Sequence, residues 1–328
     1  MDIEIYGNTR PRELLSGMIT KGKEPHSIMV YGEQGLGKKA MANYIAAALM
    51  CKEKNGVPCG KCKSCKMMKD GVHPDFTVAK ANANGNYIVD ESIRPIVYDS
   101  VIKPNEGDFK VYVIPDLDMS VNTSVQAQNI LLKVIEEPPA HTVIILTARN
   151  KESFLPTIIS RTISFGMVRV TAEESEKYLR KNFPDKPDTE IISAVKAGKG
   201  NIGRCRAYLE KNSFYFGVIN ARKIAKAFSE GSEYELLKVL TEICGKKDAF
   251  REGLKLFSEI VRDSSIIRSG GKTLISCGED FASVIAGKYP ATATGRLYDI
   301  LMEYIRKLDS NCNSTLTANS LAGKMCEL

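Results

Sequence analysis

The sequence of 328 residues lacks any apolar run near the ~18 residues that a membrane-spanning helix needs. Its start, Met1-Asp2-Ile3-Glu4, has neither the basic nor the apolar region of a secretory signal peptide. Internal repeats and low-complexity segments are also missing. These absences argue against a membrane, secreted or repeat protein, and we expect a cytoplasmic protein without a membrane partner.

The composition is that of an ordinary soluble globular protein, with 43% hydrophobic and 26% charged residues. The chain is long enough for two or three domains. A net charge of +7 is mildly basic. This charge permits contact with nucleic acid or with acidic protein surfaces, but it demands neither.

The first half of the sequence alternates strand-like and helix-like stretches. Strands are predicted at 27–31, 75–79, 109–114, 142–146 and 162–165. Helices are predicted at 14–21, 40–49, 91–102 and 124–136. Such alternation predicts a parallel sheet covered by helices on both faces. Ligands of these sheets bind at the carboxyl ends of the strands.

The second half has a helical pattern throughout. Strands stop near Val168, and Thr171-Ala172-Glu173-Glu174 is a capping box that opens a helix. Apolar residues then recur at helical spacing to the end of the chain. We expect three domains: an α/β domain over 1–168, a small helical domain over 169–212 and a larger helical domain over 213–328.

A glycine-rich turn lies between the first predicted sheet strand and the helix that follows it. Gly32, Gly35, Gly37 and Lys38 match the phosphate-binding pattern, in which backbone N–H groups surround an anion and the lysine reaches the outer phosphates. The next residue should carry a hydroxyl that holds Mg²⁺, but it is Lys39. A glycine turn without ligand is the alternative interpretation.

A second position of the magnesium site is also altered. In a working P-loop ATPase, the strand that corresponds to 110–114 of this chain ends in an Asp that holds the metal. A Glu that activates water often follows this Asp. Here the strand is followed by Pro115 and Asp116. We therefore do not expect Mg²⁺ as a cofactor, and the sequence predicts a site that does not hydrolyse nucleotide. Whether ATP or ADP is bound passively stays open.

The strongest local signal is a cluster of four cysteines, Cys51, Cys59, Cys62 and Cys65. Four thiolates at this spacing suit a closed tetrahedral zinc site, which leaves no position for a catalytic water. Free core cysteines are the weaker alternative, because the intervening residues are mostly polar. Lysines surround the cluster at positions 52, 54, 61, 63, 66 and 69. They form either a DNA-facing patch or, as we prefer, a solvated surface that offsets the negative charge of the metal centre.

A third signal is Ser160-Arg161, at a corner between a loop and a strand. The arginine could form a surface ion pair. It could also be an arginine finger, a guanidinium that is offered to the nucleotide of a neighbouring subunit. The residues alone do not decide between the two.

With these residues in view, the chain resembles the bacterial DNA polymerase III clamp-loader family, a relative of the gamma/tau AAA+ subunits, and its delta-prime members most closely. The resemblance covers most of residues 5–210 and depends on Lys103–Gly107, Gln128–Pro139, Leu155–Arg161 and the cysteine insertion at 51–65. It implies an AAA+ nucleotide-binding domain, a helical lid and a helical collar. It also implies a role in DNA replication, within a hetero-pentameric ring with gamma/tau and delta that loads the sliding clamp onto primed DNA.

The resemblance also implies roles for single residues. The four cysteines would bind zinc, and Arg161 with Ser160 would complete the ATP site of a neighbouring motor subunit. Arg204, in the segment Gly200–Arg204, could touch a nucleotide, although a helix cap and a solvated arginine explain the segment equally well. The altered magnesium positions favour the non-hydrolysing delta-prime role.

Two other functions are compatible with the residues. One is a gamma/tau-like motor ATPase with unusual metal coordination through Asp116 or Asp118. The other, which we rank last, is a zinc module that binds DNA on its own.

Overall fold

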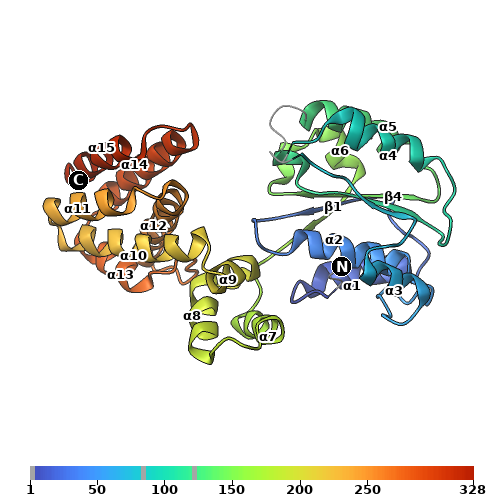
Figure 1. Ribbon diagram of the computed structural model, residues 1–328, viewed down its shortest axis with the longest axis horizontal. Coiled ribbons are helices and arrows are strands. Elements are labelled where there is room, and N and C mark those ends of the chain that lie inside the picture. Colours follow the sequence, from blue (N-terminus) through green and yellow to red (C-terminus); the bar gives the residue numbers. More distant parts are fainter. Residues whose placement is uncertain (1–3, 83–85, 120–123) are drawn as a thin grey trace. The chain divides into compact units, whose positions relative to one another are not determined.

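The computed structural model describes residues 4–82, 86–119 and 124–328, and it divides the chain into two compact units, Met1–Val170 and Thr171–Leu328 (Figure 1). Residues 1–3, within the N-terminal stretch that we expect to lack a signal peptide, lie outside the described part. In the described residues, no helix is both long enough and apolar enough to span a bilayer.

The first unit is built on a five-stranded parallel sheet in the order β2-β3-β4-β1-β5. The strands are β1 (Ser27–Tyr31), β2 (Phe76–Val78), β3 (Lys110–Ile114), β4 (Thr142–Ala148) and β5 (Ile163–Gly166). The predicted strands and their parallel arrangement are thus confirmed. The central strands β1, β3 and β4 are buried almost throughout, which explains their continuous apolar sequences.

Helices cover both faces of this sheet (Figure 1). One face carries α1 (Thr9–Ile19), α2 (Lys38–Leu49) and α3 (Lys63–Asp70). The other carries α4 (Arg94–Ser100), α5 (Ser124–Glu136) and α6 (Pro156–Arg161). Two short 3₁₀ helices, η2 (Leu117–Met119) and η3 (Lys151–Ser153), follow β3 and β4. Each face has its own buried apolar cluster, so the sheet separates two cores.

The helix predicted over 91–102 differs in the structure. It begins earlier, as the π-helical turn η1 (Val89–Ile93), and α4 then ends at Ser100. Pro95 lies in the first turn of α4, where it has no N–H to donate to the preceding turn. A continuous α-helix across this point would lose a hydrogen bond, and the chain changes to α-helical geometry there.

The second unit is entirely helical in the structure. Its helices are α7 (Ala172–Asn182), α8 (Asp188–Gly198), α9 (Ile202–Leu209), α10 (Ser213–Glu230), α11 (Glu233–Ile243), α12 (Lys247–Arg268), α13 (Glu279–Lys288), α14 (Ala291–Asp309) and α15 (Ser314–Cys326). The predicted capping box is present, because Thr171 and Glu174 bond each other's backbone N–H reciprocally. One apolar cluster joins α7, α8 and α9, and a larger one joins the helices from α10 onward. The division near residue 212 stays a prediction, since the compact unit includes both clusters.

Candidate functional site

The glycine-rich loop lies between β1 and α2 and needs its glycines. Gly32, Gly35 and Gly37 have φ angles of 147°, 91° and 86°, which side chains disfavour. A Cβ atom on Gly32 would also lie 3.0 Å from the carbonyl oxygen of Met167. Gly37 is the N-cap residue of α2, so the loop leads directly into a helix N-terminus. This is the backbone geometry of an anion-binding loop.

Lys38 is buried, with 7% of its side chain exposed, and its ammonium lies inside its own loop. Nζ donates to the carbonyl oxygens of Gly32 at 2.9 Å and Glu33 at 3.3 Å. It also lies 3.7 Å from a carboxylate oxygen of Asp116. Burial lowers the pKa of Lys38, an effect that the charges of Asp116 and Asp118 oppose. An incoming phosphate would therefore compete with these internal partners for the ammonium.

Two arginines that follow β4 and β5, the strands on either side of β1, also hold the loop. Arg169 forms a double ion pair with Glu33, with N···O distances of 2.9 to 3.1 Å. Arg149, which follows β4, donates to the side-chain oxygen of Gln34. Reasoning from the sequence missed the role of Arg169, because no local pattern connects residues 136 positions apart. The loop is thus fixed by contacts within the protein.

At the magnesium positions Lys39 is exposed, whereas the acidic residues that follow β3 have partners within the fold. The N–H of Asp116 donates to the hydroxyl of Thr147 at 2.9 Å, and this hydroxyl lies 3.3 Å from the Asp116 carboxylate. Asp118 accepts the N–H of Arg149 at 2.7 Å and that of Asn150 at 3.3 Å. Both carboxylates therefore shape the turns that follow β3 and β4.

The second candidate site is the cysteine cluster, which the structure brings together. The sulfur atoms of Cys51, Cys59, Cys62 and Cys65 all lie within 4.8 Å of one another. Sulfurs of a regular tetrahedral zinc site, with Zn–S bonds of about 2.3 Å, would be about 3.8 Å apart. The Cys59 and Cys65 sulfurs are 3.9 Å apart. The cluster could hold a metal ion after only small movements.

Backbone groups around the cluster favour thiolates. The N–H groups of Lys61 and Cys62 point to the Cys59 sulfur, at 3.5 and 3.3 Å. These bonds, that of Cys62 first, lower the pKa of Cys59 to about 6. Burial raises the pKa of Cys51 and of Cys65. Metals bind the thiolate form of cysteine. A cation bound by all four sulfurs would therefore stabilise the negative charge that burial otherwise disfavours.

The cysteine module (residues 51–65) is attached to the rest of the first unit by charge and by close packing. Lys63 pairs with the Glu106 carboxylate at 2.8 Å, and Lys54 pairs with Asp108 at 2.7 Å. Gly56 lies against Ser16 of α1, where a Cβ atom would come within 2.6 Å of the Ser16 backbone. Lysines that partner the protein are less available to DNA, which weakens the interpretation of this module as a DNA-binding surface.

Asp75, just before β2, organises the loop that receives these lysines. Its buried carboxylate accepts the backbone N–H groups of Asn105, Glu106 and Gly107 at 2.7 to 3.2 Å. The neighbouring His73 bonds Ser64 and the Asp75 N–H through its two ring nitrogens, so it is not a cluster ligand. Burial raises the pKa of Asp75, but the hydrogen bonds outweigh it and leave the pKa below its usual value.

We expect Asp75→Asn to destabilise the first unit by about 2 kcal/mol near neutral pH, because an amide accepts these N–H bonds less well. A carboxylate whose pKa is lowered by folding stabilises the protein above its ordinary pKa and loses this effect as the pH falls through the lower, folded value. The difference in unfolding free energy between the wild type and the variant should therefore shrink below about pH 4. Urea denaturation across pH measures it. A difference that is independent of pH would contradict the role given to the charge.

Arg161, the candidate arginine finger, is the last residue of α6 and is exposed, like Ser160. Its guanidinium donates to the Thr157 carbonyl oxygen at 3.1 Å and lies 3.4 Å from a Glu136 carboxylate oxygen. Both Arg161 and Glu136 are more than 40% exposed in this pair. An ion pair of this kind is weak, so the arginine can exchange it for another anion.

Gln128 of α5 is a supporting residue that sequence reasoning did not single out. It is buried, and its side-chain oxygen accepts the N–H of Leu155 at 2.8 Å, where α6 begins. Glu136, at the other end of α5, contacts Arg161. Helix α5 thus contacts both ends of the short helix that carries Arg161.

Arg204 belongs to the second unit and has partners there. Its guanidinium forms a double hydrogen bond with Glu259 of α12, at 3.0 and 2.7 Å. It also lies 5.7 Å from the centre of the Phe214 ring. Asn201 caps α9 by accepting the Arg204 N–H. These contacts give Arg204 a structural role, and a nucleotide contact by this residue stays a prediction.

The fold and the loop define a P-loop-type α/β domain joined to a helical unit, and comparisons with known proteins give its family. Residues 7–170 match the family model described as "DNA polymerase III, delta subunit". The chain belongs to the DNA polymerase III clamp-loader family, as the sequence patterns predicted. The predicted fold class is confirmed as far as a parallel α/β domain with a glycine-rich loop after β1, followed by an all-helical part.

Individual relatives agree with this family. The chain is 33% identical over 182 residues to the DNA polymerase III subunit delta' of Pseudomonas aeruginosa, covering 55% of this chain and 54% of the relative. It is 31% identical over 178 residues to the subunit gamma of Buchnera aphidicola, covering 54% and 47%. The matched region thus spans about half the length of these relatives. The alignment with a solved DNA polymerase III gamma subunit-related protein of Thermotoga maritima covers 96% of this chain and 98% of that protein, with a TM-score of 0.43 and 19% identity.

Proposed function

We propose that this chain is a non-hydrolysing, delta-prime-type subunit of a clamp loader. In this role it supplies ring interfaces and offers Arg161 to the ATP site of a neighbouring gamma/tau subunit. The observation that carries the proposal is the internal pairing of the glycine loop. Lys38 bonds its own loop and faces Asp116, while the position of the magnesium hydroxyl carries Lys39.

The proposed partners follow from the family. They are gamma/tau motor subunits and delta in a hetero-pentameric ring, with the sliding clamp and primed DNA reached through the complex. In this assignment residues 169–212 form the lid, and residues 213–328 form the collar that joins the subunits. The protein would work in the cytoplasm, where DNA replication takes place in bacteria.

Zinc is the metal we propose for the cysteine cluster. Four sulfur ligands select a soft, tetrahedrally bound ion, and a closed set of four leaves no open position for water. The role of such a metal is structural. The four cysteines would hold it, and the N–H groups that point to Cys59 would help them do so.

A motor ATPase with unusual metal coordination is the second candidate. The observation in its favour is that Asp116 and Asp118 both lie close enough to influence the charge of Lys38. One carboxylate oxygen of Asp118 is buried without a hydrogen-bond partner in the described residues. The partners of these carboxylates in the turns after β3 and β4 argue against a free metal site.

Steady-state ATP hydrolysis by the purified chain separates the two candidates. We expect no turnover above background, and no change in the variant Lys38→Ala, since the ammonium serves its own loop. In a reconstituted loader, the Lys38→Ala chain should support the same ATPase rate as the wild type. Magnesium-dependent turnover by the isolated chain that disappears in Lys38→Ala and in Asp118→Asn would establish the motor function instead.

A further inference from the structure

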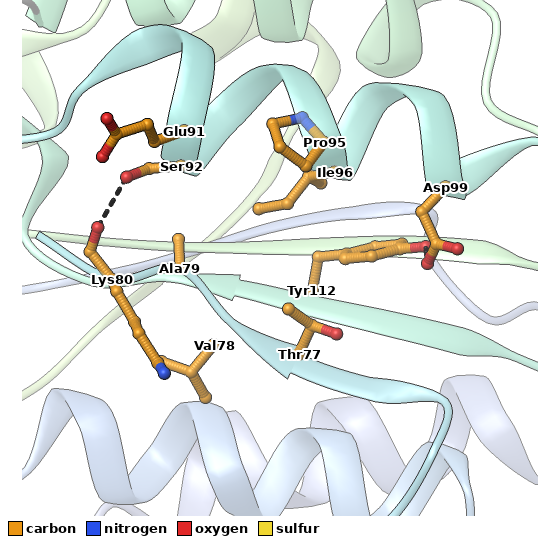
Figure 2. Close-up of a pocket in the computed structure, with 10 residues that line it drawn as sticks. All are labelled: Thr77, Val78, Ala79, Lys80, Glu91, Ser92, Pro95, Ile96, Asp99 and Tyr112. Atoms are coloured by element: carbon orange, nitrogen blue, oxygen red, sulfur yellow. Dashed lines mark hydrogen bonds between the residues drawn. The ribbon is translucent and has the colours of Figure 1, made fainter.

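A groove runs along β2, on the face of the sheet that carries α4 (Figure 2). It encloses about 340 Å³, within the range of roughly 300 to 1,000 Å³ that ligand sites in proteins occupy. Thr77, Ala79 and Tyr112 form its floor, and Pro95 and Ile96 line one wall. The groove exists because Thr77 of β2 and Ala79, just after β2, are small, while α4 packs over the neighbouring strand β3.

The backbone of β2 is open beside this groove. In the part of the chain that the structure describes, β2 is the last strand of the sheet on its side. The Val111 N–H donates to the backbone carbonyl oxygen of Asp75 at 2.9 Å, and the Ala79 N–H donates to that of Val113 at 2.8 Å. Alternate residues of a strand bond opposite neighbours, so the N–H and C=O of Val78 point away from β3. An edge of this kind can accept a further strand.

The charges at the groove select the residues of such a strand. Figure 2 shows the carboxylates of Glu91 and Asp99 at opposite ends of the helical wall, while the Lys80 ammonium points away from the groove. Asp99 already accepts the Tyr112 hydroxyl at 2.6 Å and Lys110 at 2.8 Å. Its side chain is still 46% exposed, and each carboxylate oxygen has a second lone pair. Between the two carboxylates the wall is formed by Pro95 and Ile96 and by Ser92, whose hydroxyl donates to the Lys80 carbonyl oxygen at 2.7 Å.

We propose that the β2 edge and its groove bind an extended peptide segment as an additional strand. The segment would place an apolar side chain in the groove, with a lysine or arginine two positions before it and two positions after it. The eight residue-to-residue steps from Glu91 to Asp99 rise about 12 Å along the helical wall, and residues i and i+4 of a strand lie about 13 Å apart. Side chains at i, i+2 and i+4 share one face, so the basic ends meet the two carboxylates.

The protein contains no tryptophan, so the fluorescence of a tryptophan in a peptide reports on the peptide alone. The probe is a blocked peptide of sequence Lys-Thr-Trp-Thr-Lys, titrated with the full chain. We expect a saturable blue shift and slower hydrogen exchange at the Val78 amide. Glu91→Lys should weaken binding about tenfold, because an attraction becomes a repulsion. Thr77→Tyr, which fills the groove, should abolish binding.

Matched controls are exposed residues of the same unit that do not line the groove. Glu152→Lys and Val72→Tyr should bind like the wild type, and circular dichroism checks that each variant is folded. A blocked Glu-Thr-Trp-Thr-Glu peptide should not bind. The proposal is overturned if the lysine peptide gives no shift, if it binds Thr77→Tyr or Glu91→Lys as well as the wild type, or if Val78 exchange is unchanged.

Discussion

Replacing Arg161 by alanine is expected to slow ATP hydrolysis at the adjacent motor site of a reconstituted clamp loader by about 10³-fold. An arginine finger stabilises the charge that develops on the transferring phosphate through its fork of charged donors. Arg161 is suited to it because it ends a helix, is exposed and holds only a weak pair with Glu136. Single-turnover hydrolysis in the assembled complex measures the effect.

Two further variants separate a finger from a residue that merely holds the interface. Arg161→Lys keeps the charge but not the fork of donors. The ring with this variant should assemble and should keep only a small part of the wild-type rate. Arg94→Ala removes another exposed arginine of the same unit, which pairs with Asp90, and should leave hydrolysis unchanged. If the ring with Arg161→Ala assembles normally and hydrolyses ATP at the wild-type rate, Arg161 is not the finger.

The sheet could be predicted because its information is local. Each central strand is a short apolar run between residues that break structure, and parallel order follows from the helices between them. The edge strand β2 was predicted over 75–79 but is only three residues long, since it has a partner on one side alone. The π-helical turn before α4 was not predicted, because its geometry depends on where Pro95 falls in a packed helix.

The candidate sites divide in the same way. The cysteine spacing and the glycine turn are short-range patterns, and the structure brings both sets of residues together. The contacts that fix them are long-range. Arg169 reaches Glu33 across 136 residues, and Asp75 reaches Asn105 across 30. No periodicity or spacing in the sequence predicts such pairs. The ion pairs of the glycine loop could therefore be identified only in the folded chain.

Removing the metal is expected to have the second large effect, on stability instead of rate. A ligand that binds only the folded state stabilises it by about 4 kcal/mol when its free concentration is a thousandfold above its dissociation constant. We expect one zinc per purified chain by elemental analysis, and a loss of about this size in Cys62→Ser or on chelation. Cys62 is a sensitive position because its sulfur also caps α3 by accepting the Cys65 N–H.

The attachments of the module determine which elements respond to this loss. Gly56 packs on Ser16 of α1, and Lys63 pairs with Glu106, so an unfolded module releases both α1 and the loop before β3. Hydrogen exchange should therefore accelerate first in Thr9–Ile19 and at residues 105–108, while α10 to α15 keep their protection. Cys312→Ser, an exposed cysteine outside the cluster, should change neither zinc content nor stability. Full zinc occupancy in Cys62→Ser, or a wild-type chain that chelators leave equally stable, would contradict a structural metal at this site.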